Sequence, residues 1–350
     1  MKLPLPPRWL RRLILWPLPV IGGVFYAVSA PLWFLAAILL SYKLPGQMRL
    51  ARSLGLATVY LAVEVLIIVS CFALWIGSGF GWRIKSERFI YLHYSLLRLS
   101  LAILVGTGRR LFALNIAVAS KGIPASTEAD GAPLIVMSRH AGPADSILLM
   151  HEVMNWHGRR PRIVMSDLLQ FDPAFDILLN RLPNRFISTN GFASVKAISE
   201  LAKGMTNADA LVIFPEGGNF TEGKRVKMIE RLRVGGFEAA AKRAQELRNV
   251  LPPRPAGSLA ALGAAPHADA VFVAHTGIDK IAGVGDLWTA LPDNKTLHIQ
   301  WRVVKAKDLP KDALDQRELL YLAWEEIDRW IARHKDASAK ADPSFHNSLN

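Results

Sequence analysis

Two long apolar stretches dominate the first quarter of the chain. Residues 13–40 carry no charged side chain, although three prolines interrupt them, and residues 54–82 carry only Glu64. Each stretch exceeds the roughly 20 residues that a helix needs to cross the hydrocarbon of a bilayer. Core helices of soluble proteins are rarely this long and this free of charge. The pattern predicts a membrane anchor over residues 1–82.

A cleaved signal peptide is the alternative interpretation of the N-terminus. Basic residues, an apolar core and the small residues 28–30 occur in the order typical of such a peptide. The apolar run nevertheless continues to Leu40, where a cleaved peptide would give way to polar sequence. Basic residues precede the first stretch and also occupy the loop between the two stretches. This distribution favours a hairpin with both ends in the cytoplasm.

The next segment alternates basic and apolar positions at helical spacing. Arginine and lysine recur from Arg83 to Arg110, and leucine and isoleucine lie between them. This pattern predicts an amphipathic helix in the membrane interface, with a linker, over residues 83–128. An ordinary packing helix is the alternative.

Beyond residue 120 the chain alternates between strand and helix patterns. Strands are predicted at residues 134–137, 162–165, 185–188, 210–214, 270–274 and 298–304. Helices are predicted at residues 146–156, 192–203, 228–248, 258–265 and 314–337. Such alternation is typical of an α/β fold with a mostly parallel sheet flanked by helices. We therefore expect a catalytic domain over residues 129–310 and a C-terminal helix with a polar tail over residues 311–350.

Composition narrows the classes of partner. The formal net charge is +13, and 51% of the residues are hydrophobic. A basic chain with membrane segments favours an anionic lipid surface over nucleic acid. The basic stretch 224–248 supports this view, because Phe237 is its only aromatic residue. Cys71 is the only cysteine, so neither an internal disulfide nor a thiolate metal cluster can form.

His140 and Asp145 are the first candidate catalytic pair. They lie five residues apart, directly after the predicted strand 134–137, and Gly142 and Pro143 separate that strand from a helical pattern. Open α/β sheets bind their ligands at the carboxyl ends of strands. An imidazole held by a carboxylate is a common general base for activating a hydroxyl.

A second cluster follows the predicted strand 210–214. Glu216 comes first, followed by Gly217 and Gly218, which allow backbone N–H groups to approach a ligand closely. Lys224 and Arg225 come shortly afterwards. A carboxylate and backbone amides beside basic side chains suit a ligand that carries both hydroxyl and phosphate groups, although a simple turn after a strand is equally consistent.

The remaining histidines are weaker candidates. His151 and His157 are six residues apart, which does not place them on one helix face as in a helical zinc site, so we predict no metal site. His275 lies at another predicted strand end. It either lines the same cleft or has a structural role.

Together, the two motifs resemble those of the glycerolipid acyltransferase family. The family carries His-x-x-x-x-Asp, matched by His140 and Asp145, and Phe-Pro-Glu-Gly-Thr, matched by Phe214 to Gly217, about 70 residues further on. The resemblance extends over residues 133–304. Residues 250–257 also resemble a Leu-Pro-Arg segment of one lysophosphatidate acyltransferase branch.

Three positions depart from the family pattern, and the proline of its fourth block is also not evident around residues 271–275. Gly218 replaces the usual threonine, and Asn219 follows in place of a frequent arginine. The second block of the family ends in an arginine that binds phosphate, and this chain has Thr189 at that position. Arg185, Lys224 and Arg225 are the candidates to replace it. These departures concern the residues that would recognise the acceptor head group, and they leave the residues of the transfer reaction in place.

The resemblance implies a membrane-bound acyltransferase without a cofactor. His140 would take the proton from the hydroxyl of a lysophospholipid, Asp145 would hold the imidazole, and the alkoxide would attack acyl-CoA or the thioester of acyl carrier protein. Glu216, Gly217 and the basic residues would bind the acceptor, for which 1-acylglycerol-3-phosphate is the first expectation. Another lysophospholipid, a glycolipid, or an inactive lipid-binding protein are the alternatives. We expect membrane phospholipids as partners, and a catalytic domain on the cytoplasmic side of the inner membrane.

Overall fold

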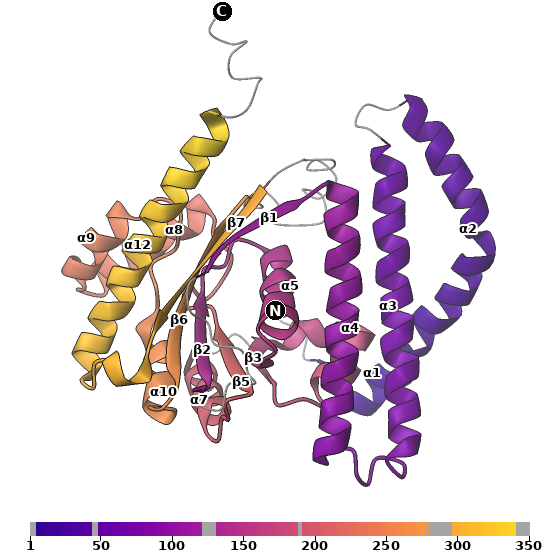
Figure 1. Ribbon diagram of the computed structural model, residues 1–350, viewed down its shortest axis with the longest axis horizontal. Helices are drawn as coiled ribbons and strands as arrows, with labels where there is room; N and C mark the ends of the chain where they lie inside the picture. The colour runs from indigo at the N-terminus through magenta and orange to yellow at the C-terminus, as the bar shows by residue number, and fades with distance from the viewer. Residues whose placement is uncertain are drawn as a thin grey trace, which may run out of the picture. The chain divides into compact units, whose positions relative to one another are not determined.

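The structure of this chain is a computed structural model that describes residues 5–43, 48–120, 131–187, 191–277, 279 and 296–340. The chain divides into two compact units, coloured along the sequence in Figure 1. The first unit includes residues 1–114 and 147–197. The second includes residues 115–146, 198–286 and 295–350.

Three helical segments of the first unit are long and apolar enough to cross a membrane. They are α1 (Arg8–Leu15) continuing into α2 (Pro17–Lys43), then α3 (Arg49–Gly77), and then α4 (Glu87–Phe112). Figure 1 shows α2, α3 and α4 side by side. The first two segments were predicted as spans. The third was expected to be interfacial, but its length and composition also qualify it as a span.

The long helices expose much of their apolar surface. In α2 only Ala37 and Ser41 are buried, whereas Val28 is 80% exposed and Phe25 is 74% exposed. Water would penalise a continuous apolar surface of this size, whereas lipid would not. The three segments are therefore compatible with association with a membrane.

The other elements of the first unit are short. They are α5 (Pro143–His151), a π-helical turn (Glu152–Trp156), β3 (Arg160–Ser166), a 3-10 turn (Asp167–Phe171), α6 (Pro173–Leu179), β4 (Arg185–Ile187) and α7 (Gly191–Ala202). The first turn of α5 and the end of α7 belong to the second unit. Strands β3 and β4 pair in parallel, with Val164 opposite Arg185. Residues 188 and 189, at the end of the predicted strand 185–188 and just beyond it, lie outside the described residues.

The second unit contains a mixed five-stranded sheet. Its strands are β1 (Asn115–Ser120), β2 (Leu134–Ser138), β5 (Asp209–Ile213), β6 (Asp269–Thr276) and β7 (Thr296–Val304), in the order β1-β7-β6-β2-β5. Only β6 and β7 pair antiparallel. Every residue of β2, β5 and β6 is buried, which explains their uninterrupted apolar sequences.

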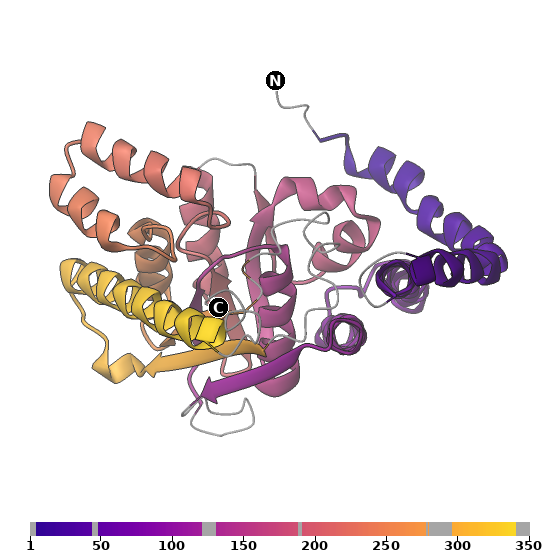
Figure 2. The same ribbon diagram turned by 90° about the horizontal axis from the view of Figure 1, so that it is seen from above.

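Helices cover this sheet. They are α8 (Glu222–Val234), α9 (Glu238–Glu246), α10 (Pro255–Ala264) and α12 (Ala313–Lys340), with a 3-10 turn (Ala306–Asp308) before α12. Helix α12 packs on β6, and its Trp324 is completely buried. Figure 2 shows α12 lying along the sheet when it is seen from above. Across both units, the seven described strands are mostly parallel and flanked by helices, so the predicted fold class is confirmed.

Two local predictions were wrong. The stretch 228–248 was expected to be one helix, but it divides into α8 and α9 at Gly235 and Gly236. Gly236 has a φ of +76°, which favours glycine and ends a helix. Strand β1 was expected to be linker, because its six residues give no clear periodicity. Its pairing with β7 defines it as a strand.

A buried ion cluster stabilises the first unit. Asp176 of α6 is 1% exposed, and its carboxylate accepts from Arg11 at 2.7 Å and from Arg12 at 2.9 Å. Arg11 is itself only 5% exposed. Removal of either partner from such a cluster leaves an uncompensated buried charge.

Replacement of Asp176 by alanine is expected to destabilise the protein by about 3 kcal/mol, because it leaves the buried Arg11 guanidinium without its carboxylate partner. The drop should appear as a lower midpoint of thermal unfolding in detergent. Asp308→Ala, at an exposed aspartate in a short turn, is the control and should leave the midpoint unchanged. Equal midpoints for the two variants would contradict this assignment.

Candidate active site

The candidate general base lies where β2 ends and α5 begins. Strand β2 ends at Ser138, and His140 follows two residues later. Asp145 occupies the first turn of α5, so its side chain turns back toward the loop. The Nδ1 atom of His140 lies 3.1 Å from Oδ1 of Asp145. The structure thus brings together the two residues that the sequence pairs.

The Asp145 carboxylate is buried and fully engaged. Its Oδ2 atom accepts hydrogen bonds from the backbone N–H groups of Ala141 and Gly142, the latter at 2.9 Å. Burial alone would raise the pKa of Asp145, but the hydrogen bond from His140, with His275 nearby, outweighs burial and lowers it. Asp145 is therefore ionised at neutral pH, and an ionised carboxylate only accepts hydrogen bonds.

This arrangement selects one tautomer of His140. Because Asp145 accepts, Nδ1 carries the proton and Nε2 has a free lone pair. No described residue is hydrogen-bonded to Nε2, and 18% of the His140 side chain is exposed. The ring stacks on Phe214 with centroids 4.3 Å apart. A fixed imidazole with an open, basic nitrogen is suited to accept a proton from a hydroxyl group.

Glu216 holds the loop around His140 in place. The side chain is fully buried, and its two oxygens accept from the backbone N–H groups of His140 at 3.3 Å and of Leu251 at 3.1 Å. Burial raises the pKa of Glu216 to about 8. The sequence suggested that Glu216 contacts the acceptor. In the structure its oxygens bond backbone groups, which indicates a positioning residue.

A second histidine approaches the same carboxylate. His275, at the end of β6, has Nε2 3.6 Å from Oδ2 of Asp145 and 3.1 Å from the carbonyl oxygen of Arg139. The carbonyl can only accept, so Nε2 carries the proton. Burial lowers the pKa of His275 and keeps the ring neutral. The other nitrogen, Nδ1, is buried without a hydrogen-bond partner among the described residues.

Arg139 and Asp279 extend this buried network. The guanidinium of Arg139 is fully buried, donates to the carbonyl oxygen of His275 at 2.8 Å and pairs with Asp279. Burial would raise the pKa of Asp279, but Arg139 lowers it to about 2. Neither Arg139 nor Asp279 was predicted as a site residue. Arg139 could have been suspected, because a charged residue at the end of an apolar strand and next to His140 needs a partner when it is buried.

A basic side chain lies beside the glycine turn after β5. It is Arg254, from the segment 250–257 that the sequence had singled out without naming this arginine as a site residue. Gly217 has a φ of +68°, and a Cβ atom built there would lie 3.0 Å from Nη1 of Arg254. The backbone N–H of Arg254 donates to the carbonyl oxygen of Pro215 at 2.8 Å. Lys224 reaches the same turn, where its Nζ donates to the carbonyl oxygen of Asn219 at 3.0 Å. Arg254 and Lys224 are therefore the cations beside Gly217 and Gly218.

Two predicted basic residues have other surroundings. Arg225 is 8% exposed, and its guanidinium pairs with Glu222 at 2.6 Å and donates to the carbonyl oxygen of Leu247 at 3.0 Å. These contacts join α8 to the end of α9 and leave little of Arg225 for a ligand. Arg185 is an exposed residue of β4 in the first unit, so it is not among the residues that the second unit brings together around His140.

Comparison with known proteins identifies one domain. A family model described as Acyltransferase matches residues 119–250, which include His140, Asp145, Glu216 and Gly217. No curated protein and no solved structure matches the chain.

Glu216 should make stability depend on pH. Its carboxyl stays protonated in the folded state up to about pH 8, whereas in the unfolded chain it ionises near its ordinary pKa of 4.5. Between these values the unfolded state has lost a proton that the folded state keeps. The contribution to stability therefore falls as pH rises, by at most about 1.4 kcal/mol per pH unit.

Thermal unfolding between pH 5 and pH 8 would measure this dependence. Glu216→Gln, which cannot ionise, is expected to give a flatter profile than the parent protein, whatever its absolute stability. Parallel profiles would show that Glu216 does not titrate in this range.

Proposed function

We propose that this chain is a glycerolipid acyltransferase, because a family model described as Acyltransferase matches residues 119–250, and that it transfers an acyl chain from a thioester to the free hydroxyl of a lysophospholipid. The thioester is acyl-CoA or acyl carrier protein, and the acceptor is 1-acylglycerol-3-phosphate, giving phosphatidate. The hydrogen bond between His140 and the buried, ionised Asp145 is the observation that carries this proposal.

The proposed reaction is a direct transfer. Nε2 of His140 removes the proton from the acceptor hydroxyl, and the oxygen attacks the carbonyl carbon of the thioester. Asp145 stabilises the imidazolium that forms. The tetrahedral intermediate then expels the thiolate, which takes the proton back from His140, so that the products are an ester and a free thiol. The thioester is already activated, so positioning and charge stabilisation supply most of the rate enhancement.

The acceptor phosphate needs a cation, and Lys224 is suitably placed. Its Nζ lies beside Gly218, whose lack of a side chain leaves room for a close approach. Lys224 is thus the candidate to replace the arginines that the family pattern places after the glycine turn and in its second block. Its position favours a phosphate monoester. A larger head group or a glycolipid is the second candidate, because Gly218 and Asn219 depart from that pattern.

Loss of His140 is the direct test of this mechanism. Purified protein with palmitoyl-CoA and lysophosphatidate is expected to release thiol, and His140→Ala is expected to lower kcat by roughly 10²–10⁴-fold. His267→Ala is the matched control, because the one hydrogen bond of His267 among the described residues is to the carbonyl oxygen of Met205. Thiol release at the parental rate in His140→Ala would disprove the general-base role. A panel of lysolipid acceptors with product mass analysis identifies the head group.

We further propose that the protein is bound to the inner membrane, with its catalytic domain on the cytoplasmic side. The support is the run of exposed apolar helices and the basic residues between them. With Cys71 changed to serine, a cysteine at Lys227, an exposed position of α8, is expected to resist a membrane-impermeant maleimide in intact cells and to react in inverted vesicles. The reverse pattern of labelling would place the domain outside.

A further inference from the structure

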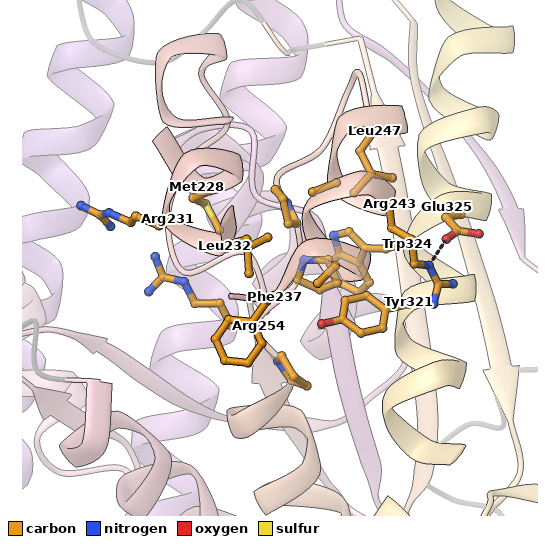
Figure 3. Close-up of a pocket in the computed structure, with 15 residues that line it drawn as sticks. Met228, Arg231, Leu232, Phe237, Arg243, Leu247, Arg254, Tyr321, Trp324 and Glu325 are labelled. Carbon is orange, nitrogen blue, oxygen red and sulfur yellow. Dashed lines mark hydrogen bonds and ion pairs between the residues drawn. The ribbon is translucent and has the colours of Figure 1, made fainter. Parts of the chain in front are cut away.

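A pocket of about 380 Å³ lies in the second unit, between α8, α9, α12 and the loop before α10. Figure 3 shows it with arginines at its edge and aromatic rings in its wall. Arg231 and Arg254 extend on one side, and Arg243 lies on the other, against α12. This volume falls within the range of small-molecule sites.

The pocket has an excess of positive charge. Three arginines line it, against the single carboxylate of Glu325. Arg243 is already neutralised, because it pairs with Glu318 and Glu325 at 2.7 Å each. Arg231 and Arg254 have no ion-pair partner in the described part of the chain. Two unpaired guanidinium groups at one pocket are a favourable site for phosphate.

Aromatic rings provide a flat apolar surface beside these charges. Phe237 is 63% exposed, and Tyr321 of α12 lines the pocket with it, with the Arg243 guanidinium 5.0 Å from the centroid of its ring on one face. Gly235 leaves room for the Phe237 ring, since a Cβ atom there would lie 3.0 Å from Cδ2 of that ring. The same glycine pair that divides α8 from α9 thus presents this ring to the pocket. Planar rings of this kind stack on nucleobases.

Arg254 joins the pocket to the candidate active site. Its side chain lines the pocket and also lies against Gly217, and its backbone N–H donates to the carbonyl oxygen of Pro215. The next residue, Glu216, accepts from the backbone N–H of His140. A ligand that starts in the pocket and passes Arg254 therefore reaches the turn whose Glu216 accepts from the backbone N–H of the proposed general base, His140.

We propose that this pocket binds the nucleotide end of coenzyme A. The adenine ring stacks on Phe237 and Tyr321, and the phosphate groups bind Arg231 and Arg254, while the flexible pantetheine arm extends past Gly217 toward His140. The inference rests on the proposed function and names its acyl donor. Glycerol phosphate has no aromatic part to occupy these rings, and acyl carrier protein presents its thioester arm without a nucleotide.

Binding of coenzyme A to the full-length protein in detergent, measured by calorimetry, tests this site without requiring turnover. Arg231→Glu and Phe237→Ala change exposed side chains and are each expected to raise the Kd by about tenfold. Arg233→Glu is the matched control, because Arg233 lies on the same helix, pairs weakly with Glu230 and does not line the pocket. Its Kd should equal that of the parent. In the transfer assay, the pocket variants should raise KM for palmitoyl-CoA without lowering kcat.

Equal affinity for coenzyme A in all four proteins would overturn the proposal. So would pocket variants that weaken lysophosphatidate instead, or that impair only transfer from acyl carrier protein. Failure of the proposed function is distinguishable. A protein that acylates no lysolipid but loses coenzyme A affinity in the two pocket variants keeps the nucleotide site. If instead those variants transfer the acyl chain normally, with an unchanged KM for palmitoyl-CoA, the nucleotide site is disproved while the proposed function stands.

Discussion

The buried carboxylate of Asp145 is the constraint on which the candidate active site depends. A carboxylate that leaves water must receive hydrogen bonds, and this one receives them from two backbone N–H groups and from His140. The backbone donors hold the loop after β2 in a single conformation. The imidazole donor sets which nitrogen of His140 keeps its proton. One buried charge therefore determines the position, the orientation and the tautomer of the proposed base.

Further buried polar groups support the same loop from its other sides. Glu216 joins the backbone of His140 to that of Leu251, and Arg139 joins the end of β6 to Asp279. Each of these groups would be costly to bury alone, and each has a partner. The turn at Glu216 also positions Arg254. The proposed base and the proposed coenzyme A pocket thus share a short stretch of backbone, which provides a route from a bound nucleotide to the reacting hydroxyl.

The differences between expectation and structure have a common cause. A single helix was predicted over residues 228–248 because apolar residues recur there at helical spacing. The two adjacent glycines interrupt this helix, since Gly236 ends α8 through its positive φ. Arg225 was taken as a ligand-binding residue because it is basic and follows the glycine turn. It is instead bound to Glu222 and to the carbonyl oxygen of Leu247. Net charge along a sequence does not show which cations are already neutralised within the fold.

The sequence by itself determined the fold class, the apolar N-terminal helices and the pairing of His140 with Asp145. These depend on periodicity and on short spacings, which local backbone geometry converts directly into structure. Only the tertiary structure decided the roles of Arg139, His275, Asp279 and Arg254. Their partners lie up to 140 residues away along the chain, where strand order and loop packing, rather than spacing, determine which groups meet. A buried charge is recognised as part of a site only when its distant partner is known.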